Sequence, residues 1–153
     1  MTISLEYAAG MFDGEGYFTI GKCSPTNVKM GVRPMRLQAY AGLTIREKAI
    51  CDAFEMLFGG FVRGCAPRRA QHSYVWRWML SGPGLISFCQ RLGPRCIIKQ
   101  ERCYLIEDFQ FLKSGIRSRP ITDVEYEKSV RLYWRLRELN QKGPKRPLVR
   151  AAA

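Results

Sequence analysis

The feature that most constrains this sequence is the nine-residue run AAGMFDGEG, which extends from Ala8 to Gly16. Apolar residues in and before this run recur at the spacing of one helix face, so it predicts a helix that ends near Glu15. Gly10 and Gly14 lie one turn apart, although each glycine costs a helix about 1 kcal/mol relative to alanine. Such a pair is typical of a helix face that another backbone approaches closely.

Glu15 ends this predicted helix. The C-terminal end of a helix carries the negative end of the macrodipole, so a carboxylate there is disfavoured by about a few tenths of a kcal/mol. A bound cation reverses the sign of this interaction. The position of Glu15 therefore favours a cation beside it.

The run resembles the signature of the LAGLIDADG homing endonucleases. It departs from that signature at Ala8, which replaces the first leucine, and at Glu15, which replaces the last aspartate and keeps the carboxylate. The resemblance depends on the small residues, on the two acids at i and i+2, and on the β-rich segment that follows. The alternative is a plain amphipathic helix that ends in a glycine-rich turn.

The composition indicates a polyanionic partner. Lysine and arginine number 25 against 13 acidic residues, which gives a net charge of +12. Nucleic acid is favoured over an anionic membrane, because the basic residues fall among strand-like segments and not along one amphipathic helix. At 153 residues, 46% of them apolar, the chain predicts one domain over residues 1–143, followed by a basic and disordered tail over residues 144–153.

The sequence contains no visible export signal and no apolar run of the roughly 18 residues that a membrane span needs. We therefore expect an intracellular protein of a chloroplast, a mitochondrion or a prokaryotic cytoplasm. The six cysteines include no C-x-x-C pair, and His72 is the sole histidine, which argues against a zinc site. Buried thiols are the simplest interpretation of the cysteines, and disulfides are the alternative.

Two predicted hairpins follow the first helix. Residues 17–23 and 35–45 read as strands, and the second alternates most cleanly, with Leu37, Ala39, Ala41, Leu43 and Ile45 on one face and polar residues on the other. After a helix over residues 47–58, residues 61–65 and 72–81 form the second hairpin. In its second strand Tyr74, Trp76, Trp78 and Leu80 are expected in the core, although the tryptophans are also suited to stacking on bases.

Three more helices are predicted towards the C-terminus. Residues 85–92 form a short helix, and a longer one extends from about Cys96 to Lys113, with Ile98 on its apolar face and Lys99 in its first turn. A lysine there opposes the helix dipole, which leaves a functional role and a merely solvated side chain as alternatives. The last helix opens with the capping box Thr122-x-x-Glu125.

This order of elements predicts an α/β (α+β) fold with one four-stranded antiparallel sheet. It resembles the αββαββα core of the single-motif LAGLIDADG enzymes over nearly the whole domain. The resemblance implies a saddle-shaped sheet that binds DNA, with the helices on the opposite face.

The single copy of the motif predicts a homodimer, since a second chain with the same glycine face would cover the first through a two-fold interface. The residues expected at this interface are Ala9, Gly10, Asp13 and Gly14. The symmetry would bring the two Glu15 carboxylates together, and they would then require a cation. Oxygen ligands without histidine or thiolate favour Mg²⁺, with the backbone carbonyl of Gly14 as an extra ligand that the resemblance suggests.

The resemblance implies an enzyme that cuts both strands of a long, pseudo-palindromic double-stranded DNA site and leaves 3′ overhangs. It also implies an auxiliary catalytic lysine, which matches Lys99, and a companion at the end of the second strand. Arg46 is the candidate companion, with Lys48 as the alternative. An RNA maturase or a non-cleaving DNA-binding protein on the same scaffold is the alternative function.

Candidate DNA contacts lie on or beside the two hairpins, where arginine suits guanine edges and glutamine suits adenine. They are Lys22, Arg33, Arg36, Gln38, Tyr40, Thr44, Arg63, Arg68, Arg69, Gln71, Ser73, Arg77 and Met79.

Overall fold

The computed structural model describes residues 1–23, 36–67, 73–116 and 119–141. Its elements are α1 (Leu5–Glu15), β1 (Gly16–Cys23), β2 (Arg36–Ile45), α2 (Lys48–Phe58), β3 (Phe61–Cys65), β4 (Val75–Ser81), α3 (Gly84–Leu92), the 3₁₀ turn Gly93–Arg95, α4 (Gln100–Ser114) and α5 (Asp123–Leu139). The predicted tail and the candidate contacts Arg33, Arg68, Arg69 and Gln71 lie outside the described residues.

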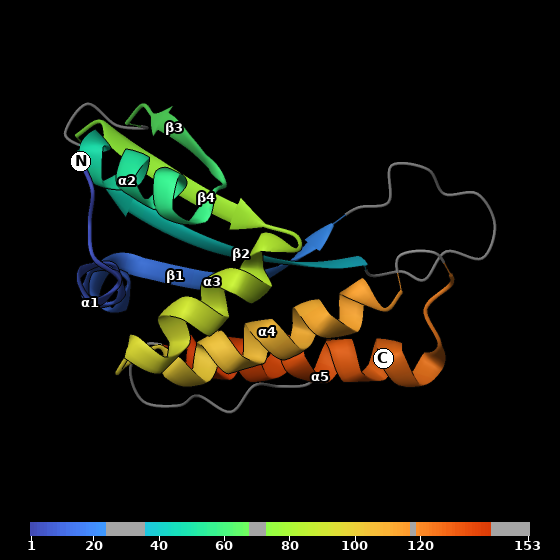
Figure 1. Cartoon of the computed structure of the whole chain (residues 1–153). Coiled ribbons are helices and arrows are strands. Elements are labelled where there is room, and N and C mark those ends of the chain that lie inside the picture. The colour runs from blue at the N-terminus through green and yellow to red at the C-terminus, as the bar shows by residue number, and fades with distance from the viewer. Residues whose placement is uncertain (24–35, 68–72, 117–118, 142–153) are drawn as a thin grey trace.

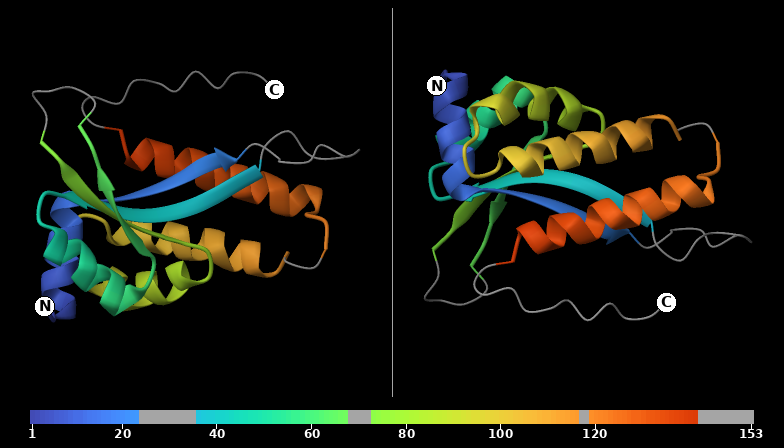
Figure 2. Two further views of the ribbon diagram at one scale, coloured as in Figure 1. Left: turned by 90° about the horizontal axis from the view of Figure 1, so that it is seen from above. Right: turned by 90° about the horizontal axis from the view of Figure 1, so that it is seen from below.

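The four strands form one antiparallel sheet in the order β1-β2-β4-β3, so the two hairpins meet where β2 pairs with β4. The helices lie on one side of this sheet (Figure 1). Seen from above the strands lie in front, and seen from below the helices do (Figure 2). The α/β fold with a four-stranded antiparallel sheet is therefore confirmed, and none of the helices in the described residues lies over the other face of the sheet.

The alternation of the strands decides which side chains meet the helices. The predicted inward residues of β1 and β2 are buried, with Ile45 partly buried at the end of β2. In β4, Trp78 is completely buried, and its indole N–H donates a 2.8 Å hydrogen bond to the carbonyl of Gly59. Gly60 follows with φ 92°, and a Cβ there would lie 2.3 Å from the carbonyl oxygen of Met79. The Gly59-Gly60 turn therefore lets α2 approach β4.

The second strand of the second hairpin is shorter than predicted. It begins at Val75, and Tyr74 is 49% exposed, so its assignment to the core is wrong. The Tyr74 ring packs edge-on against Trp76, with 5.5 Å between the ring centroids. Trp76 is partly buried and Trp78 fully buried, which favours the core interpretation of the tryptophans over base stacking.

The predicted helix from Cys96 to Lys113 begins four residues late, at Gln100. Lys99 is the N-cap residue, not a member of the first turn, and Ile98 is 65% exposed, not buried. The apolar spacing of residues 96–99 is helical, but the backbone N–H groups of residues 97–99 are bound by a side chain from α1. Hydrogen bonds between distant segments thus override a local pattern here.

The remaining predicted helices are confirmed. The four apolar residues of α3, Leu85, Phe88, Cys89 and Leu92, are buried, and α5 begins with the predicted capping box of Thr122 and Glu125. None of the helices in the described ranges has the length and apolar character required to cross a membrane. The five cysteines whose side chains are described are free thiols, and four of them are buried: Cys51, Cys89, Cys96 and Cys103.

Candidate active site and nucleic-acid interface

Glu15 is exposed at the last residue of α1, and β1 begins at the next residue. The helix is fixed from beneath by Phe12, whose ring packs edge-on against Phe18 and Phe88 with centroids 5.0 and 5.1 Å away. Gly16 is needed directly after Glu15, because a Cβ at Gly16 would lie 2.3 Å from the Phe12 ring. The packing of Phe12 therefore fixes the position of Glu15.

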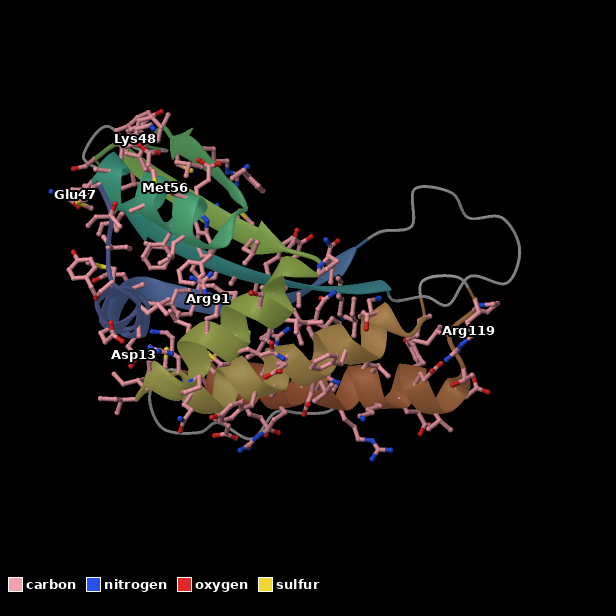
Figure 3. The ribbon with its side chains drawn as sticks, viewed as in Figure 1. Asp13, Glu47, Lys48, Met56, Arg91 and Arg119 are labelled. Carbon is pink, nitrogen blue, oxygen red and sulfur yellow. The ribbon has the colours of Figure 1, made fainter. Side chains whose placement is uncertain are left out.

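Asp13 is bound within the chain. Its carboxylate accepts hydrogen bonds from the backbone N–H groups of Ile97 at 2.6 Å, Ile98 at 3.1 Å and Lys99 at 2.9 Å. The Lys99 ammonium donates in return to the backbone carbonyl of Asp13. We call this reciprocal arrangement the Asp13–Lys99 clasp. It holds the segment before α4 against the end of α1. Asp13 is labelled in Figure 3.

The charges in the clasp shift two pKa values. Partial burial works to raise the pKa of Asp13, but the three backbone N–H donors and the Cys96 thiol stabilise the carboxylate, so its pKa is lowered. Burial lowers the pKa of Lys99, and Arg102 adds to this, while Asp13 and Glu15 oppose it. The Lys99 ammonium binds the carbonyl of Asp13, two residues before Glu15, so the structure places two of the three predicted catalytic residues at the same end of α1.

The third predicted catalytic residue, Arg46, is exposed just beyond β2. Because Gly16 pairs with Leu43, the end of β2 and the end of α1 lie at the same end of the sheet. The alternative, Lys48, is bound by Asp52 at 2.6 Å, and its ammonium lies 5.1 Å from the centroid of the Trp76 ring. Figure 3 shows Lys48 at the start of α2, well above Asp13. Arg46 thus lies free of α2 at the end of β2, whereas Lys48 is bound to Asp52 of the same helix.

The predicted interface residues divide into two kinds. Ala9 is buried inside the chain, and Asp13 is held in the clasp. Gly10 and Gly14 are exposed, and a Cβ at either one would meet nothing within 4 Å. Among the described residues, no close approach therefore requires these two glycines. Ile97, whose N–H binds Asp13 next to Gly14, is 90% exposed and adds an apolar side chain at this end of α1.

The outer face of the sheet carries polar and basic side chains. Thr19, Tyr40 and Ser81 stand side by side across β1, β2 and β4, and the next outward row contains Gly42 and Met79. Beyond it, Arg77 pairs with Thr44 on one side and with Arg63 on the other. Gln38 pairs with Gly21 at the far end of β2.

Arg63 and Arg77 are directly opposite each other in the β3–β4 pair. Like charges in this position are destabilising unless an anion lies over them. The Arg77 Nε donates to the Thr44 hydroxyl at 3.3 Å, which orients the guanidinium at the middle of the face. This pair places two positive charges side by side on the outer face of the sheet.

The other candidate contacts lie around this face or away from it. Ser73 is exposed just before β4, and Arg36 is the first residue of β2, where only its backbone is described. Lys22 shares the side of β1 that bears Phe18 and Ile20, and its ammonium lies 5.8 Å from the centroid of the Tyr133 ring on α5. Lys22 therefore points towards the helices and not to the outer face.

The sequence analysis did not identify two residues that contact this site. Arg102 of α4 binds the carbonyl of Ile98, and Asn140, just after α5, binds the carbonyl of Phe18. Their spacing in the sequence gives no signal, because Arg102 and Asn140 are 38 residues apart and Asn140 and Phe18 are 122 residues apart, although the bond from Arg102 to Ile98 spans four residues. Asp13 was identified, but its bonds to residues 97–99 were not.

No family model and no curated protein matches this chain in sequence. Solved structures do match its fold. The archaeal intron-encoded homing endonuclease I-Vdi141I, complexed with DNA, superposes with a TM-score of 0.72 at 16% identity, covering 92% of this chain and 86% of that chain. The homing endonuclease I-CvuI, in complex with its target and 2 mM Ca, gives 0.70 at 15% identity, with 93% and 84% covered.

The I-SmaMI LAGLIDADG homing endonuclease, bound to cleaved DNA, gives a TM-score of 0.66 at 16% identity. The match covers 86% of this chain but 43% of that chain, so this chain spans less than half the length of I-SmaMI. All three structures share the sheet and helix arrangement described above. The chain has the fold of the LAGLIDADG homing endonucleases.

Proposed function

We propose that this chain is one subunit of a homodimeric, site-specific DNA endonuclease that hydrolyses phosphodiester bonds with Mg²⁺. The observation that carries the proposal is the bond from the Lys99 ammonium to the carbonyl of Asp13, two residues before Glu15 at the end of α1. The outer sheet face, on which Arg63 and Arg77 stand opposite each other, adds to it. The cut would pass through both strands of a long, pseudo-palindromic site and leave 3′ overhangs. The DNA complexes of the structural neighbours support this class of substrate.

The outer sheet face suits double-stranded DNA. Its arginines, amide and hydroxyl groups can bind phosphates and base edges, and the helices leave this face uncovered. Two chains would carry twice the charge of one, or +24, from the +12 of each. A charge of that size draws DNA to the surface and makes binding dependent on salt.

A homodimer accounts for the glycines that the isolated chain does not need. Gly10 and Gly14 leave the backbone of α1 open to a second α1. A two-fold axis through this contact would set the two Glu15 carboxylates near each other and align the two outer sheet faces along one duplex. Each active site would then act on one strand.

The residues at the end of α1 fit a hard divalent cation. Glu15 offers an exposed carboxylate, and the carbonyl of Gly14 is one of the last four of the helix, which lack an intrahelical partner. In the described part of the chain, no group of three or more histidine, cysteine, aspartate or glutamate side chains stands close enough to hold a metal. A site with few protein ligands suits Mg²⁺, which retains waters and uses substrate phosphates as ligands.

When bound, Mg²⁺ would polarise the scissile phosphate and lower the pKa of the attacking water. Glu15 would hold the ion through its carboxylate, and Gly14 through its carbonyl. Lys99, fixed by Asp13, would present its positive charge to the developing charge on the phosphate. Arg46, exposed at the same end of the sheet, would bind the DNA backbone beside the cut.

The test is selection from a randomised library of DNA duplexes with Mg²⁺, using wild type and Glu15→Gln. We expect wild type to bind and cut a defined set of sequences, and Glu15→Gln to bind the same set without cutting it. A wild type that binds one sequence tightly and leaves it intact would point to the non-cleaving alternative. Tight binding to intron RNA with no selected duplex would point to the maturase alternative.

A further inference from the structure

Arg102 joins three segments beside the proposed active site. Its guanidinium donates to the carbonyl of Ile98 at 3.0 Å and to the side-chain oxygen of Asn140 at 3.0 Å. It also donates to the backbone carbonyl of Leu139, at the end of α5. One planar group therefore ties the turn before Lys99 to the C-terminal end of α5.

Asn140 extends this connection to the strand that follows Glu15. Its side-chain N–H donates at 2.9 Å to the carbonyl of Phe18, in β1. The chain of contacts thus runs from Phe18 through Asn140 and Arg102 to Ile98. Phe18 lies three residues after Glu15 in the sequence, and Ile98 immediately precedes Lys99.

The turn over residues 97–99 is therefore held from two sides. Asp13 binds its backbone N–H groups, and Arg102 binds one of its carbonyls. The two sets of bonds constrain the turn in different directions, since N–H and C=O groups of a backbone point to opposite sides. Loss of either set would free the turn to rotate about the other.

We propose that Arg102, held by Asn140, is a positioning residue that fixes the Lys99 ammonium relative to Glu15. The inference rests on the proposed endonuclease function and names a residue that acts through Lys99 without touching the substrate. Arginine is required because its fork binds three acceptors in one plane, whereas a lysine ammonium is a point charge that cannot span them. A displacement of about 1 Å in a catalytic group can cost about a hundredfold in rate.

Arg135 provides a matched control on the same helix pair. It joins α5 to α4 through Glu101 at 2.6 Å, but it does not bind the turn that carries Lys99. Arg135→Met removes the same charge and also breaks a contact between α4 and α5. Any effect of net charge or of general loosening between these helices should therefore appear in both variants.

The experiment measures single-turnover cleavage of a selected duplex at saturating protein and Mg²⁺, with DNA affinity measured separately in Ca²⁺. Wild type, Arg102→Met, Arg102→Lys and Arg135→Met are compared well below their melting temperatures. We expect Arg102→Met to cleave about ten to a hundred times more slowly than wild type, with DNA affinity close to that of Arg135→Met. Arg102→Lys should remain slow, and Arg135→Met should cleave like wild type.

The decisive measurement is the same substitution in a Lys99→Met background. If Arg102 acts through Lys99, the double variant Arg102→Met/Lys99→Met should cleave less than about twofold more slowly than Lys99→Met alone, because the effects of residues that act as a unit are not additive. Equal slowing in both backgrounds would overturn the inference, as would a full rate in Arg102→Lys. A wild type that fails to cut any duplex would instead refute the proposed function, so the two failures are distinct.

Discussion

The carboxylate of Asp13 and the backbone N–H of Lys99 are joined by a 2.9 Å hydrogen bond, and the Lys99 ammonium donates back to the backbone carbonyl of Asp13. The two residues are 86 positions apart in the sequence. This reciprocal contact fixes the segment before α4 against the end of α1. It explains why Lys99 stands near Glu15 although neither residue is packed in the core.

Asp13→Asn should destabilise the folded chain. An amide carries half the acceptor capacity of the carboxylate and turns an N–H group towards three N–H donors, so we expect a loss of about 1–3 kcal/mol in the free energy of unfolding at pH 7. Urea unfolding in EDTA measures this loss. Asp108→Asn, at an exposed position on α4, is the control and should change little.

The stability difference between wild type and Asp13→Asn should depend on pH. The folded-state pKa of Asp13 is lowered, so its stabilisation is fully present above the unfolded-state value of about 3.9 and is lost as pH falls through the folded value. The stability difference between wild type and Asp13→Asn should therefore shrink as the pH falls below about 4. A difference that stays constant or grows in acid would contradict the role of the ionised carboxylate.

Glu15→Gln should abolish cleavage and leave the metal-free protein at least as stable as wild type. Glutamine removes a charge from the negative end of α1, and in a dimer it removes two carboxylates that face each other. Melting curves with and without Mg²⁺ test this expectation. We expect Mg²⁺ to raise the melting temperature of the wild type more than that of the variant. A clear drop in the melting temperature of Glu15→Gln in EDTA would refute the argument.

Gly10→Ala should have opposite effects on the fold of the single chain, which it should stabilise, and on dimer association, which it should weaken. In the chain alone a Cβ at Gly10 meets nothing within 4 Å, and alanine favours a helix by about 1 kcal/mol. In a dimer packed through this face the added methyl group would hold the helices apart and weaken association. Analytical ultracentrifugation over a concentration series measures this change.

Ala49→Gly, on the exposed face of α2, is the matched control for helix propensity. It should lower the stability of the fold without changing association. If Gly10→Ala raises stability and leaves the dimer intact, α1 is not the interface.

Arg63→Gln should stabilise the free protein and weaken its binding to DNA. It removes one of two like charges that oppose each other across β3 and β4, a gain of about a few tenths of a kcal/mol. If Arg63 contacts a phosphate, the slope of log affinity against log salt should fall by about one. Arg131→Gln, on α5 beside Glu127, removes the same charge and should change the slope far less.

Much of the fold followed from local patterns. The alternation in residues 35–45 predicted β2 and its inward face, because a strand half-covered by helices must bury every second side chain. The capping box predicted the start of α5, because Glu125 and Thr122 satisfy each other's backbone groups within one turn. The glycine-rich run likewise predicted that α1 ends at Glu15.

The predictions that were wrong concern residues whose surroundings come from elsewhere in the chain. Residues 96–99 have helical spacing, but Asp13 binds the backbone N–H groups of residues 97–99, so α4 starts at Gln100. Tyr74 continues the alternation of β4 but lies beyond the end of the paired strand and remains exposed.

The sequence alone determined the periodic elements and the position of Glu15 at a helix end, because these depend on neighbours within a few residues, and the order of the elements indicated a single sheet. Only the tertiary structure decided which residues surround Glu15. Lys99 is held by Asp13, and Arg102, which binds the turn before Lys99, is itself held by Asn140. Both the contact of Asp13 with Lys99 and that of Arg102 with Asn140 join segments far apart in the chain. A hydrogen bond between such segments depends on how the helices pack against the sheet, and no spacing in the sequence encodes that packing.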